Sequence, residues 1–430
     1  MQADALTTAL AGLDGRARQL FDALYEGTRD PAGGVTRDSY GAGEQFAHDL
    51  VARHARALGL EVTHDDSCNT YMTWPGRNRV APAVVIGSHL DSVAQGGNFD
   101  GAAGVIAGLV ALEALQVAGF QPAYDLVVMG VRAEESAWFR TSYVGSRGAL
   151  GMLEPEALQA RRVDTGRTLE EHLRAAGGDP ESLRQGRPAL TPQGVRAFFE
   201  VHIEQAPALA AASRAVGIGT AIPGNARFPH ATIAGEYAHV GTPRRFRRDA
   251  ALAAADFAVA LDELWARWEA AGRPMACTIG EFSTDHARHA MTKVAGDFAF
   301  SLDLRAYEQA DVQELEAETL RLVREIEARR GVTFALGRRT AAGVAKADPE
   351  LLAQLEACAS AAGIATMRIH SPASHDAAAF CAAGIPFGFV FIRNAHGSHH
   401  PGEDMRIEDF IDATSVVAHW LMTHAAARPD

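Results

Sequence analysis

Cysteine is scarce in this sequence, which has only Cys68, Cys277, Cys358 and Cys381 in 430 residues and no CxxC pair. This scarcity argues against a zinc ribbon or a disulfide framework and favours a reducing compartment. No apolar run is long enough to span a membrane. The N-terminal stretch MQADALTTALAGLDGRARQLF has the pattern of an amphipathic helix rather than of a signal peptide. We therefore expect a cytoplasmic protein.

Positive charge is also in short supply. Lys and Arg number 40 against 53 Asp and Glu, which gives a net charge of −13 and a pI near 5.7. This balance argues against nucleic acid or an anionic membrane as the main partner. It still allows a small acidic substrate, because a few local arginines can outweigh the global charge at one site.

Four short apolar runs, in a chain long enough for two domains, predict buried strands. They are AVVIGSHLDS at 83–92, DLVVMGVRAEE at 125–135, RAFFEVHIEQ at 196–205 and IPFGFVFIRN at 385–394. A helix of small residues, which ends at Gly119, separates the first two. This alternation favours an α/β fold with a mainly parallel sheet flanked by helices. Ligands bind such sheets beyond the carboxyl ends of the strands.

The segment 213–340 has a different pattern. A β-type run, RFPHATIAGEYAHV, precedes an alanine-rich helix, and the runs ACTIGEFST and DFAFSLDLRA follow. A charged helix and the short run VTFALG complete the segment. The order β-α-β-β-α-β predicts a ferredoxin-like α+β domain. We expect this domain to be inserted into a larger one formed by 1–212 and 341–430.

Polar residues stand where the four predicted strands end. They are His89, Asp91 and Asp100 near the first strand, Glu134 and Glu135 after the second, His202 and Glu204 at the third, and His396, His399 and His400 after the last. Taken alone, each of these residues has an ordinary structural explanation: a polar side chain that ends a strand, a solvated pair of charges or part of a surface turn. Their coincidence at every strand end favours a metal site, since zinc accepts imidazole and carboxylate ligands. Side chains from four strand ends could provide enough ligands to hold two ions.

The residue types suggest separate tasks at such a site. Asp100, in a glycine-bounded loop, could bridge two ions with its two oxygens. Paired ions lower the pKa of a water between them, and a carboxylate that is not a ligand must then take its proton. Adjacent Glu134 and Glu135 would provide one base and one ligand. Asp91 could accept the free ring N–H of His89 and fix its tautomer.

Longer motifs surround these residues. They are GGVTRDSYGAGEQ, GSHLDSVAQGGNFDGAAGV, EVHIEQAP, FSLDLR, SHDAAAF and GSHHPGED. By these motifs the chain resembles the amidase, hydantoinase/carbamoylase family of N-carbamoyl-L-amino-acid hydrolases and allantoate amidohydrolases. That family belongs to the binuclear zinc superfamily of aminoacylases and carboxypeptidase G. The resemblance covers nearly the whole length and implies a zinc-exopeptidase-like catalytic domain with an inserted lid or dimerisation domain.

The resemblance implies two divalent ions per subunit, with zinc expected first and manganese, cobalt or nickel as alternatives. The implied ligands are His89, Asp100, Glu135, His202 and His399, with Asp100 bridging. Glu134 would be the general base, and Asp91, which would orient His89, is expected as a further catalytic residue. The register of SHHPGE places the ligand at His399 rather than at His400, and His396 has no counterpart.

Further residues are implied as substrate contacts. In the family the inserted domain forms the interface of a homodimer, and its histidine, here His239, reaches the partner's active site and supports the oxyanion. Gln205 and Arg305 resemble the groups that bind the substrate carboxylate, which suits a planar guanidinium. The other implied substrate-binding positions are Thr292, Arg227 and His375.

Several departures from the family pattern fall on the expected substrate side. Thr292 stands where an asparagine is usual, and EESAWF puts Ser136 and Trp138 into an EEGxRF motif. HVGTPRR replaces HAGTTPM, SPASHDA replaces SGAGHDA, and HIEQAP replaces HIEQGP. The expected metal ligands survive all of these changes. Hydrolysis is therefore expected, while the identity of the substrate stays open.

The leading functional hypothesis is hydrolysis of a linear, non-peptide C–N bond beside a carboxylate. N-carbamoyl-L-amino acids are the first substrate class, with the amino acid, ammonia and carbon dioxide as products. Allantoate and 3-ureidopropionate are close alternatives. A second hypothesis keeps the superfamily but makes the chain an N-acyl amino acid deacylase or a dipeptidase. A third, a non-catalytic binding or scaffold protein, would predict loss of a ligand or of the base, and neither is lost.

Overall fold

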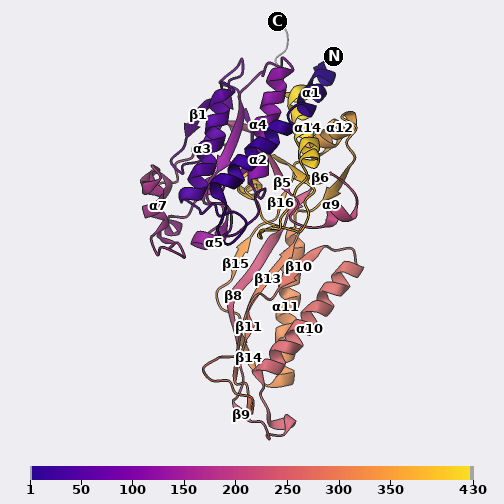
Figure 1. Ribbon diagram of the computed structural model, residues 1–430. Helices are drawn as coiled ribbons and strands as arrows, with labels where there is room; N and C mark the ends of the chain where they lie inside the picture. The colour runs from indigo at the N-terminus through magenta and orange to yellow at the C-terminus, as the bar shows by residue number, and fades with distance from the viewer. Residues whose placement is uncertain (1, 427–430) are drawn as a thin grey trace. The chain divides into compact units, whose positions relative to one another are not determined.

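Two compact units make up the part of the chain that the structure describes, residues 2–426 (Figure 1). In this computed structural model the smaller unit is Ala221–Ala345, while the larger one ends at Thr220 and resumes at Lys346. The smaller unit is therefore inserted into the larger one along the chain. Each unit has its own hydrophobic core.

The observed limits differ slightly from the expected limits of 213 and 340. Strand β6 (Val216–Gly219) pairs with strands of the larger sheet, so the chain up to Thr220 belongs to the larger unit. Strand β15 (Thr340–Ala342) pairs within the smaller sheet, so the smaller unit continues past 340. Both strands are too short to show a readable period in the sequence.

The larger unit is built on one eight-stranded sheet with the order β1-β2-β4-β3-β5-β18-β6-β17. Besides β6, its strands are β1 (Glu61–His64), β2 (Thr70–Trp74), β3 (Ala83–His89), β4 (Leu126–Val131), β5 (Val195–Ile203), β17 (Thr366–Ile369) and β18 (Phe387–Ile392). The central strands β4, β3, β5 and β18 run parallel, and antiparallel pairs flank them on both sides. The expected mainly parallel sheet is confirmed.

The central strands form where the sequence has continuous apolar runs. Every residue of β4 and of β18 is buried, as expected for strands covered on both faces. All four predicted runs contain a strand, and the polar residues fall at the carboxyl ends. His89 closes β3, and His202 is the last residue but one of β5.

Helices cover this sheet. The longer ones are α1 (Gln2–Ala11), α2 (Asp14–Thr28), α3 (Ala42–Ala57), α4 (Ala102–Val117), α12 (Pro349–Ala361) and α14 (Ile407–His424). The shorter ones are α5 (Ser136–Phe139), α6 (Val144–Ala149), η1 (Pro155–Gln159), α7 (Leu169–Ala175), α8 (Pro180–Arg184), α9 (Ala208–Ala211) and α13 (Ala377–Ala382). None of the described helices combines the length and apolar character needed to cross a membrane.

Helix α4 lies directly against the sheet because its residues are small. A Cβ on Gly104 would lie 2.0 Å from the carbonyl oxygen of Val201, and one on Gly108 would lie 2.9 Å from the Val128 side chain. The N-terminal α1 and the C-terminal α14, far apart in the sequence, both pack against α4 and against each other (Figure 1). This close packing fixes the loop that precedes α4, which carries Asp100.

The smaller unit has the β-α-β-β-α-β order that the sequence predicts. These elements are β8 (Gly224–Ala234), α10 (Ala250–Ala270), β10 (Met275–Thr278), β13 (Asp297–Ala306), α11 (Gln309–Arg330) and β14 (Thr333–Ala335). The sheet order is β10-β13-β8-β14, and every pair is antiparallel. The additional short elements are β7 (Ala221–Ile222), β9 (Ala238–His239), η2 (Arg244–Phe246), β11 (Phe282–Ser283), β12 (Lys293–Val294) and β16 (Ala345–Lys346).

One face of the smaller sheet packs on α10 and α11. Alternate residues of β13 are buried in the core of this unit, among them Phe298, Phe300 and Leu304. The intervening residues of β13 are only partly buried or exposed, and they include Asp303 and Arg305. This alternation is the period-2 pattern of a sheet with one covered face.

Candidate active site

Three groups of candidate metal ligands lie among the described residues of the larger unit, and two of them contain Asp100. The first of these two is His89, Asp100 and His202, and the second is Asp100, Glu135 and His399. Within each group, one nitrogen or oxygen atom per residue lies within 4.8 Å of the others. These are the five residues that the family resemblance implied as ligands.

The first group forms because β3 and β5 are neighbouring parallel strands that carry His89 and His202 at their ends. The two Nε2 atoms lie 3.4 Å apart. His202 Nε2 lies 3.1 Å from Asp100 Oδ1, and His89 Nε2 lies 3.8 Å from the same oxygen. Three donor atoms thus converge at the carboxyl ends of the two strands.

The Nδ1 atoms of both rings have oxygen partners. His202 Nδ1 lies 2.9 Å from the carbonyl oxygen of Ile203. His89 Nδ1 lies 3.1 Å from the carbonyl oxygen of Asp91 and 3.3 Å from its Oδ1. A proton on Nδ1 satisfies these oxygens and leaves Nε2 as the lone-pair donor of each ring.

The second group joins the end of β4 to the loop after β18. His399 Nε2 lies 3.2 Å from Asp100 Oδ2 and 3.1 Å from Glu135 Oε1. His399 has a φ of +64°, a conformation that costs energy in a residue other than glycine. Hydrogen bonds to Asp100 and Glu135 raise the pKa of the His399 imidazole to about 11. This position therefore strongly favours positive charge.

The donor set fits a pair of divalent cations. Oδ1 of Asp100 faces His89 and His202, and its Oδ2 faces His399. Burial opposes ionisation of Asp100, but hydrogen bonds from His202 and His399 hold its pKa well below the ordinary value. A charged carboxylate that faces both groups has the chemistry of a bridging ligand.

Gly101 makes room for the His89 ring. A Cβ at this position would lie 2.5 Å from three ring atoms of His89, and the φ of Gly101 is +67°. We expect Gly101→Ala to lower the free energy of unfolding by at least ~2 kcal/mol and to reduce the metal content, because it adds backbone strain and displaces a ligand. Chemical denaturation and metal analysis measure these two effects.

Gly119→Ala is the matched control for Gly101→Ala. Gly119 follows the same helix and has a φ of +71°, but a Cβ there would meet nothing within 4 Å. It should therefore share the backbone strain and leave the metal content unchanged. Equal metal content in the two variants would contradict the role given to Gly101.

Two buried carboxylates hold three consecutive backbone amides at the end of β4. Glu44 Oε1 accepts the N–H of Ala133 at 2.8 Å. Asp91 Oδ1 and Oδ2 accept the N–H groups of Glu134 and Glu135, each at 3.1 Å. Ala133 has a φ of +49°, which the three bonds help to hold. The turn that delivers the two glutamates is thus fixed through its backbone.

Glu134 belongs to neither ligand group. Its side chain is buried, and burial raises the pKa of Glu134 well above the ordinary value. The charge of His89 opposes this rise, while those of Glu135 and Asp376 add to it. A carboxyl group that holds its proton more firmly than usual is suited to general acid and base chemistry near neutral pH.

Gln205 and His375 lie against the first ligand group. Gln205 Nε2 donates to both oxygens of Asp100, at 3.2 and 3.1 Å, and Gln205 has a φ of +62°. The His375 ring lies 4.5 Å from the His202 ring, centre to centre, and its Nε2 lies 2.7 Å from Ser371 Oγ. Burial lowers the pKa of His375 well below the ordinary value, which favours the neutral form of this ring.

Other polar residues at the strand ends have partners elsewhere. Glu204 accepts the backbone N–H groups of Ala208 and Leu209, so its carboxylate serves the start of α9. The His400 ring contacts the carbonyl oxygen of His396 and the N–H of Gly402. These bonds give Glu204 and His400, both polar residues of the strand-end pattern, structural partners.

Four expected substrate residues belong to the smaller unit. Arg227 and Arg305 both bond to Oδ2 of Asp303, at 3.0 and 2.9 Å. His239 is exposed and pairs with Lys293 between β9 and β12. The carbonyl oxygen of Thr292 accepts the N–H of Val240 at 3.0 Å. Within the smaller unit, Arg227 and Arg305 thus form one cluster around Asp303, while His239 and Thr292 lie at the pair of short strands β9 and β12.

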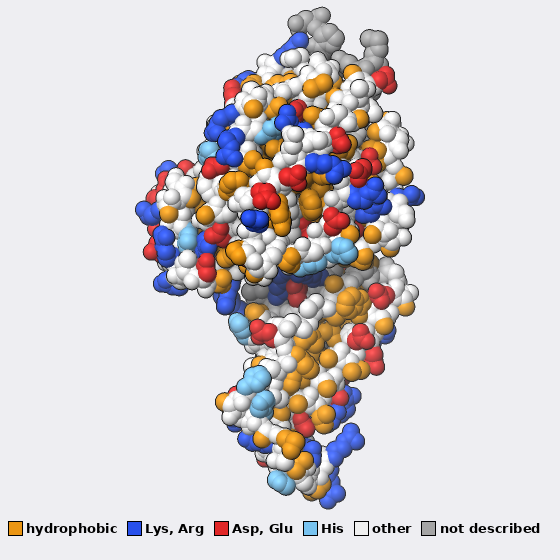
Figure 2. Space-filling model, in the orientation of Figure 1, with side chains coloured by type: hydrophobic (Ala, Val, Ile, Leu, Met, Phe, Trp, Pro, Cys, Tyr) orange, Lys and Arg blue, Asp and Glu red, His pale blue; other side chains and the backbone are white. Residues whose placement is uncertain are grey.

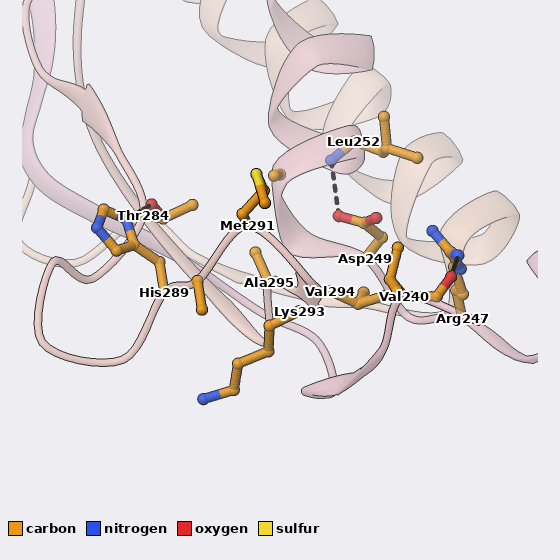
Figure 3. A pocket seen from close by; sticks show the side chains of 12 residues that line it. Val240, Arg247, Asp249, Leu252, Thr284, His289, Met291, Lys293, Val294 and Ala295 are labelled. Carbon is orange, nitrogen blue, oxygen red and sulfur yellow. Dashed lines mark hydrogen bonds between the residues drawn. The ribbon is translucent and has the colours of Figure 1, made fainter. Parts of the chain in front are cut away.

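A pocket of about 710 Å³ lies beside β9 and β12 in the smaller unit (Figure 3). It is lined by Val240, Arg247, Asp249, Ala251, Leu252, Thr284, His289, Ala290, Met291, Lys293, Val294 and Ala295. Asp249 caps α10 by accepting the N–H of Leu252 at 3.1 Å, as the dashed line in Figure 3 shows. No residue of the two ligand groups lines this pocket, so the pocket is separate from the candidate metal site.

The same unit exposes several large hydrophobic side chains. They are Val240, Phe246, Leu252, Val259, Phe282 and Met291. Figure 2 shows hydrophobic side chains gathered on the visible face of this unit. Exposed apolar patches of this kind are typical of surfaces that contact another macromolecule.

Trp138 is a departure that the structure places in the core. Its side chain is buried, and its indole N–H donates to the carbonyl oxygen of Ser92 at 2.8 Å. The Arg162 guanidinium lies 5.0 Å from the centre of the ring. Trp138 therefore supports the loop after β3, and its expected place on the substrate side stays a prediction. Ser136 is exposed at the start of α5.

Sequence reasoning missed several buried charged residues around the site. They are Arg37, Glu44, Glu200, Asp376 and Glu403. Of these residues, Glu200 is the one that the sequence could have indicated, because it precedes His202 by two residues on β5 and its side chain points to the same face. Glu200 forms a third group of candidate ligands with His202 and His375. Burial raises the pKa of Glu200 to about 8.

Comparisons with known proteins agree with this architecture. A family model described as peptidase family M20/M25/M40 matches residues 85–423. An N-carbamoyl-L-amino acid amidohydrolase of Geobacillus stearothermophilus is 35% identical over 407 residues, which cover 92% of this chain and 95% of that protein. An allantoate amidohydrolase of Escherichia coli (strain K12) is 28% identical over 396 residues, which cover 90% of this chain and 92% of that protein.

Solved structures agree as well. A hydantoinase/carbamoylase family amidase from Burkholderia ambifaria has a TM-score of 0.83 and 30% identity, with 96% of this chain and 98% of that chain covered. A second such amidase, from Burkholderia multivorans, has a TM-score of 0.86 and 28% identity over 97% and 98% of the two chains. The similarity therefore extends over both units.

Proposed function

The chain belongs to peptidase family M20/M25/M40, and from this premise we propose that it hydrolyses N-carbamoyl-L-amino acids. The family consists of metal-dependent hydrolases, and this chain has the clustered histidines and carboxylates that such chemistry requires. The relatives named above are amidohydrolases of carbon–nitrogen bonds other than peptide bonds. The proposed products are the free amino acid, ammonia and carbon dioxide.

One observation carries the proposal: two ligand groups share Asp100, while the carboxyl group of Glu134 belongs to neither. When bound, two divalent cations supply a Lewis acid for the substrate carbonyl and a water of lowered pKa. The residues that would hold them are His89, Asp100, Glu135, His202 and His399. Zinc is the first choice, with manganese, cobalt and nickel as alternatives, and metal analysis of the purified protein distinguishes them.

The protein's own groups would move the protons. Glu134 takes a proton from the attacking water and delivers it to the leaving nitrogen, which a carboxyl with a raised pKa is suited to do. Asp91 orients His89 and holds the amides of Glu134 and Glu135, so it positions a proposed metal ligand and the proposed base together. His239 would stabilise the oxyanion of the tetrahedral intermediate.

The substrate carboxylate would bind the arginine cluster of the smaller unit. Arg227 and Arg305 both bond to the carboxylate of Asp303, so two guanidinium groups lie together. A planar guanidinium can hold a carboxylate through two hydrogen bonds, which suits a substrate with a carboxylate next to the scissile group. Gln205, Thr292 and His375 complete the proposed substrate contacts.

A substrate panel tests the proposal. The metal-loaded protein is given N-carbamoyl-L-amino acids, allantoate, 3-ureidopropionate, N-acyl amino acids and dipeptides, and both ammonia and free amine are measured. We expect ammonia from the carbamoyl compounds and none from acyl substrates or peptides. Free amine without ammonia would instead make the chain a deacylase or dipeptidase. No turnover above the Glu134→Gln variant on any substrate would contradict catalysis.

We propose that the protein acts as a homodimer in the cytoplasm. The exposed hydrophobic side chains of the smaller unit support a protein contact there. In such a dimer His239 would serve the active site of the partner subunit. Sedimentation analysis in solution tests the dimer, and a monomer at all accessible concentrations would contradict it.

A further inference from the structure

The backbone of Asp100 is held on both sides by buried charged side chains. Glu403 Oε1 accepts the N–H of Asp100 at 3.1 Å and that of Phe99 at 2.8 Å. On the other side, Arg37 Nη2 donates to the carbonyl oxygen of Asp100 at 3.1 Å. Glu403 is 7% exposed and Arg37 is fully buried, so water does not compete for these bonds.

Glu403 stands in the same closed loop as His399. The loop leaves β18 and is tied at its base by two backbone bonds between Ala395 and Asp404, of 2.7 and 3.1 Å. The N–H of Glu403 also donates to the carbonyl oxygen of His400 at 3.2 Å. Because the Glu403 side chain accepts hydrogen bonds from the Asp100 loop, it fixes the position of His399 relative to Asp100.

The Asp100 loop is shaped to receive the Glu403 carboxylate. A Cβ on Gly97 would lie 2.1 Å from the Glu403 carboxyl carbon and 2.2 Å from its Oε1. Only glycine leaves this space open. The loop from Gly97 to Asp100 thus offers a cavity for the carboxylate and two N–H groups aimed at it.

We propose that Glu403 is a positioning residue that aligns Asp100 with His399, two members of the second ligand group, across about 300 residues of chain. It touches neither substrate nor ion and acts through the backbone of Asp100. The inference rests on the proposed metal site and deepens it, because it names what holds that site in place. Since Asp100 belongs to both groups, both ions should depend on Glu403, and the ion at His399 should depend on it most.

Titration of the metal-free full chain with Zn²⁺ alone, against a competing chelator, tests this without any substrate. Loss of an outer partner of a metal ligand typically weakens binding 10- to 100-fold. We expect Glu403→Ala to weaken the site that contains His399 by about that factor, and the His89–His202 site by less. His399→Ala and His202→Ala, each lacking one site, identify which constant belongs to which group. Glu403→Gln keeps an acceptor oxygen and should restore most of the affinity.

Gly97→Ala provides an independent variant that leaves Glu403 itself intact. Its Cβ would displace the carboxylate, so it should reproduce the Glu403→Ala pattern of Zn²⁺ constants. Asp348→Ala is the matched control, because Asp348 also accepts two backbone N–H groups, those of Glu350 and Leu351, but stands at the start of α12. It should lower the melting temperature and leave both Zn²⁺ constants unchanged.

The outcomes separate this inference from the proposed function. If the unaltered chain does not bind two Zn²⁺, the proposed metal site fails and this inference fails with it. If the unaltered chain binds two, but Glu403→Ala or Gly97→Ala binds both with unchanged constants, only the role of Glu403 is overturned. Equal weakening in Asp348→Ala would also overturn it, because the effect would then be a general loosening of the fold. Should Glu403→Ala not fold, the Zn²⁺ constants of Gly97→Ala decide.

Discussion

Glu134→Gln is expected to lower turnover by about 10²- to 10⁴-fold while the chain keeps two metal ions. The substitution preserves the size of the side chain but removes the group that accepts and returns a proton. Glu134 belongs to neither ligand group, so metal binding has no reason to change. Ammonia release from a carbamoyl substrate and metal analysis on the same sample measure both quantities.

Glu135→Gln is the control for Glu134→Gln, because the two residues are adjacent and the change is the same. Glu135 Oε1 lies 3.1 Å from His399 Nε2, so its loss should weaken the ion of the second group. The two variants should therefore differ in metal content. Identical metal content would refute the division of tasks between these glutamates.

The backbone explains why neighbouring glutamates can have different tasks. Glu135 has extended dihedral angles, φ −67° and ψ 125°, just before α5 begins at Ser136. Successive side chains of an extended segment point to opposite sides. The backbone N–H groups of Glu134 and Glu135 donate to Asp91 and hold this segment, and it is the Glu135 carboxylate that lies against His399.

The apolar runs predicted the strands, and the family resemblance selected the five candidate ligands from the polar residues at the strand ends. Continuous apolar runs identify strands that are buried on both faces, and parallel strands bring their carboxyl ends to one edge. His89 and His202 meet for this reason alone. The choice of His399 over His400 came from a family motif, and the structure gives a local reason for it, because the His400 ring bonds within its own loop.

The residues that hold the site were not predictable from the sequence. Arg37, Glu44 and Glu403 act on backbone N–H or carbonyl groups of segments far away in the chain, and such bonds leave no local pattern of residue types. Positive φ values at Ala133 and His399 also have no sequence signal, since neither is glycine. These features depend on tertiary packing, which short-range periodicity does not report.

Asp100→Asn is expected to have the second large effect, the loss of both high-affinity ion positions and of turnover by at least about 10³-fold. Asp100 is the only residue common to both groups that carry the five proposed ligands. His399→Ala removes a member of one group only, so it should leave one ion bound to His89, Asp100 and His202. Metal content per chain, measured for both variants, distinguishes a shared ligand from an ordinary one.

Asparagine is the better substitute at this position because of what surrounds Asp100 within the fold. His202, His399, Gln205 and Ser398 all contact its carboxylate, so alanine would leave these groups without that acceptor and would also lower stability. Asparagine keeps one acceptor oxygen and nearly the same shape. A thermal melt close to that of the unaltered chain, together with an absence of both ions, would therefore assign the loss to the missing negative charge. Two ions still bound to Asp100→Asn with unchanged affinity would show that the groups do not depend on a bridging carboxylate.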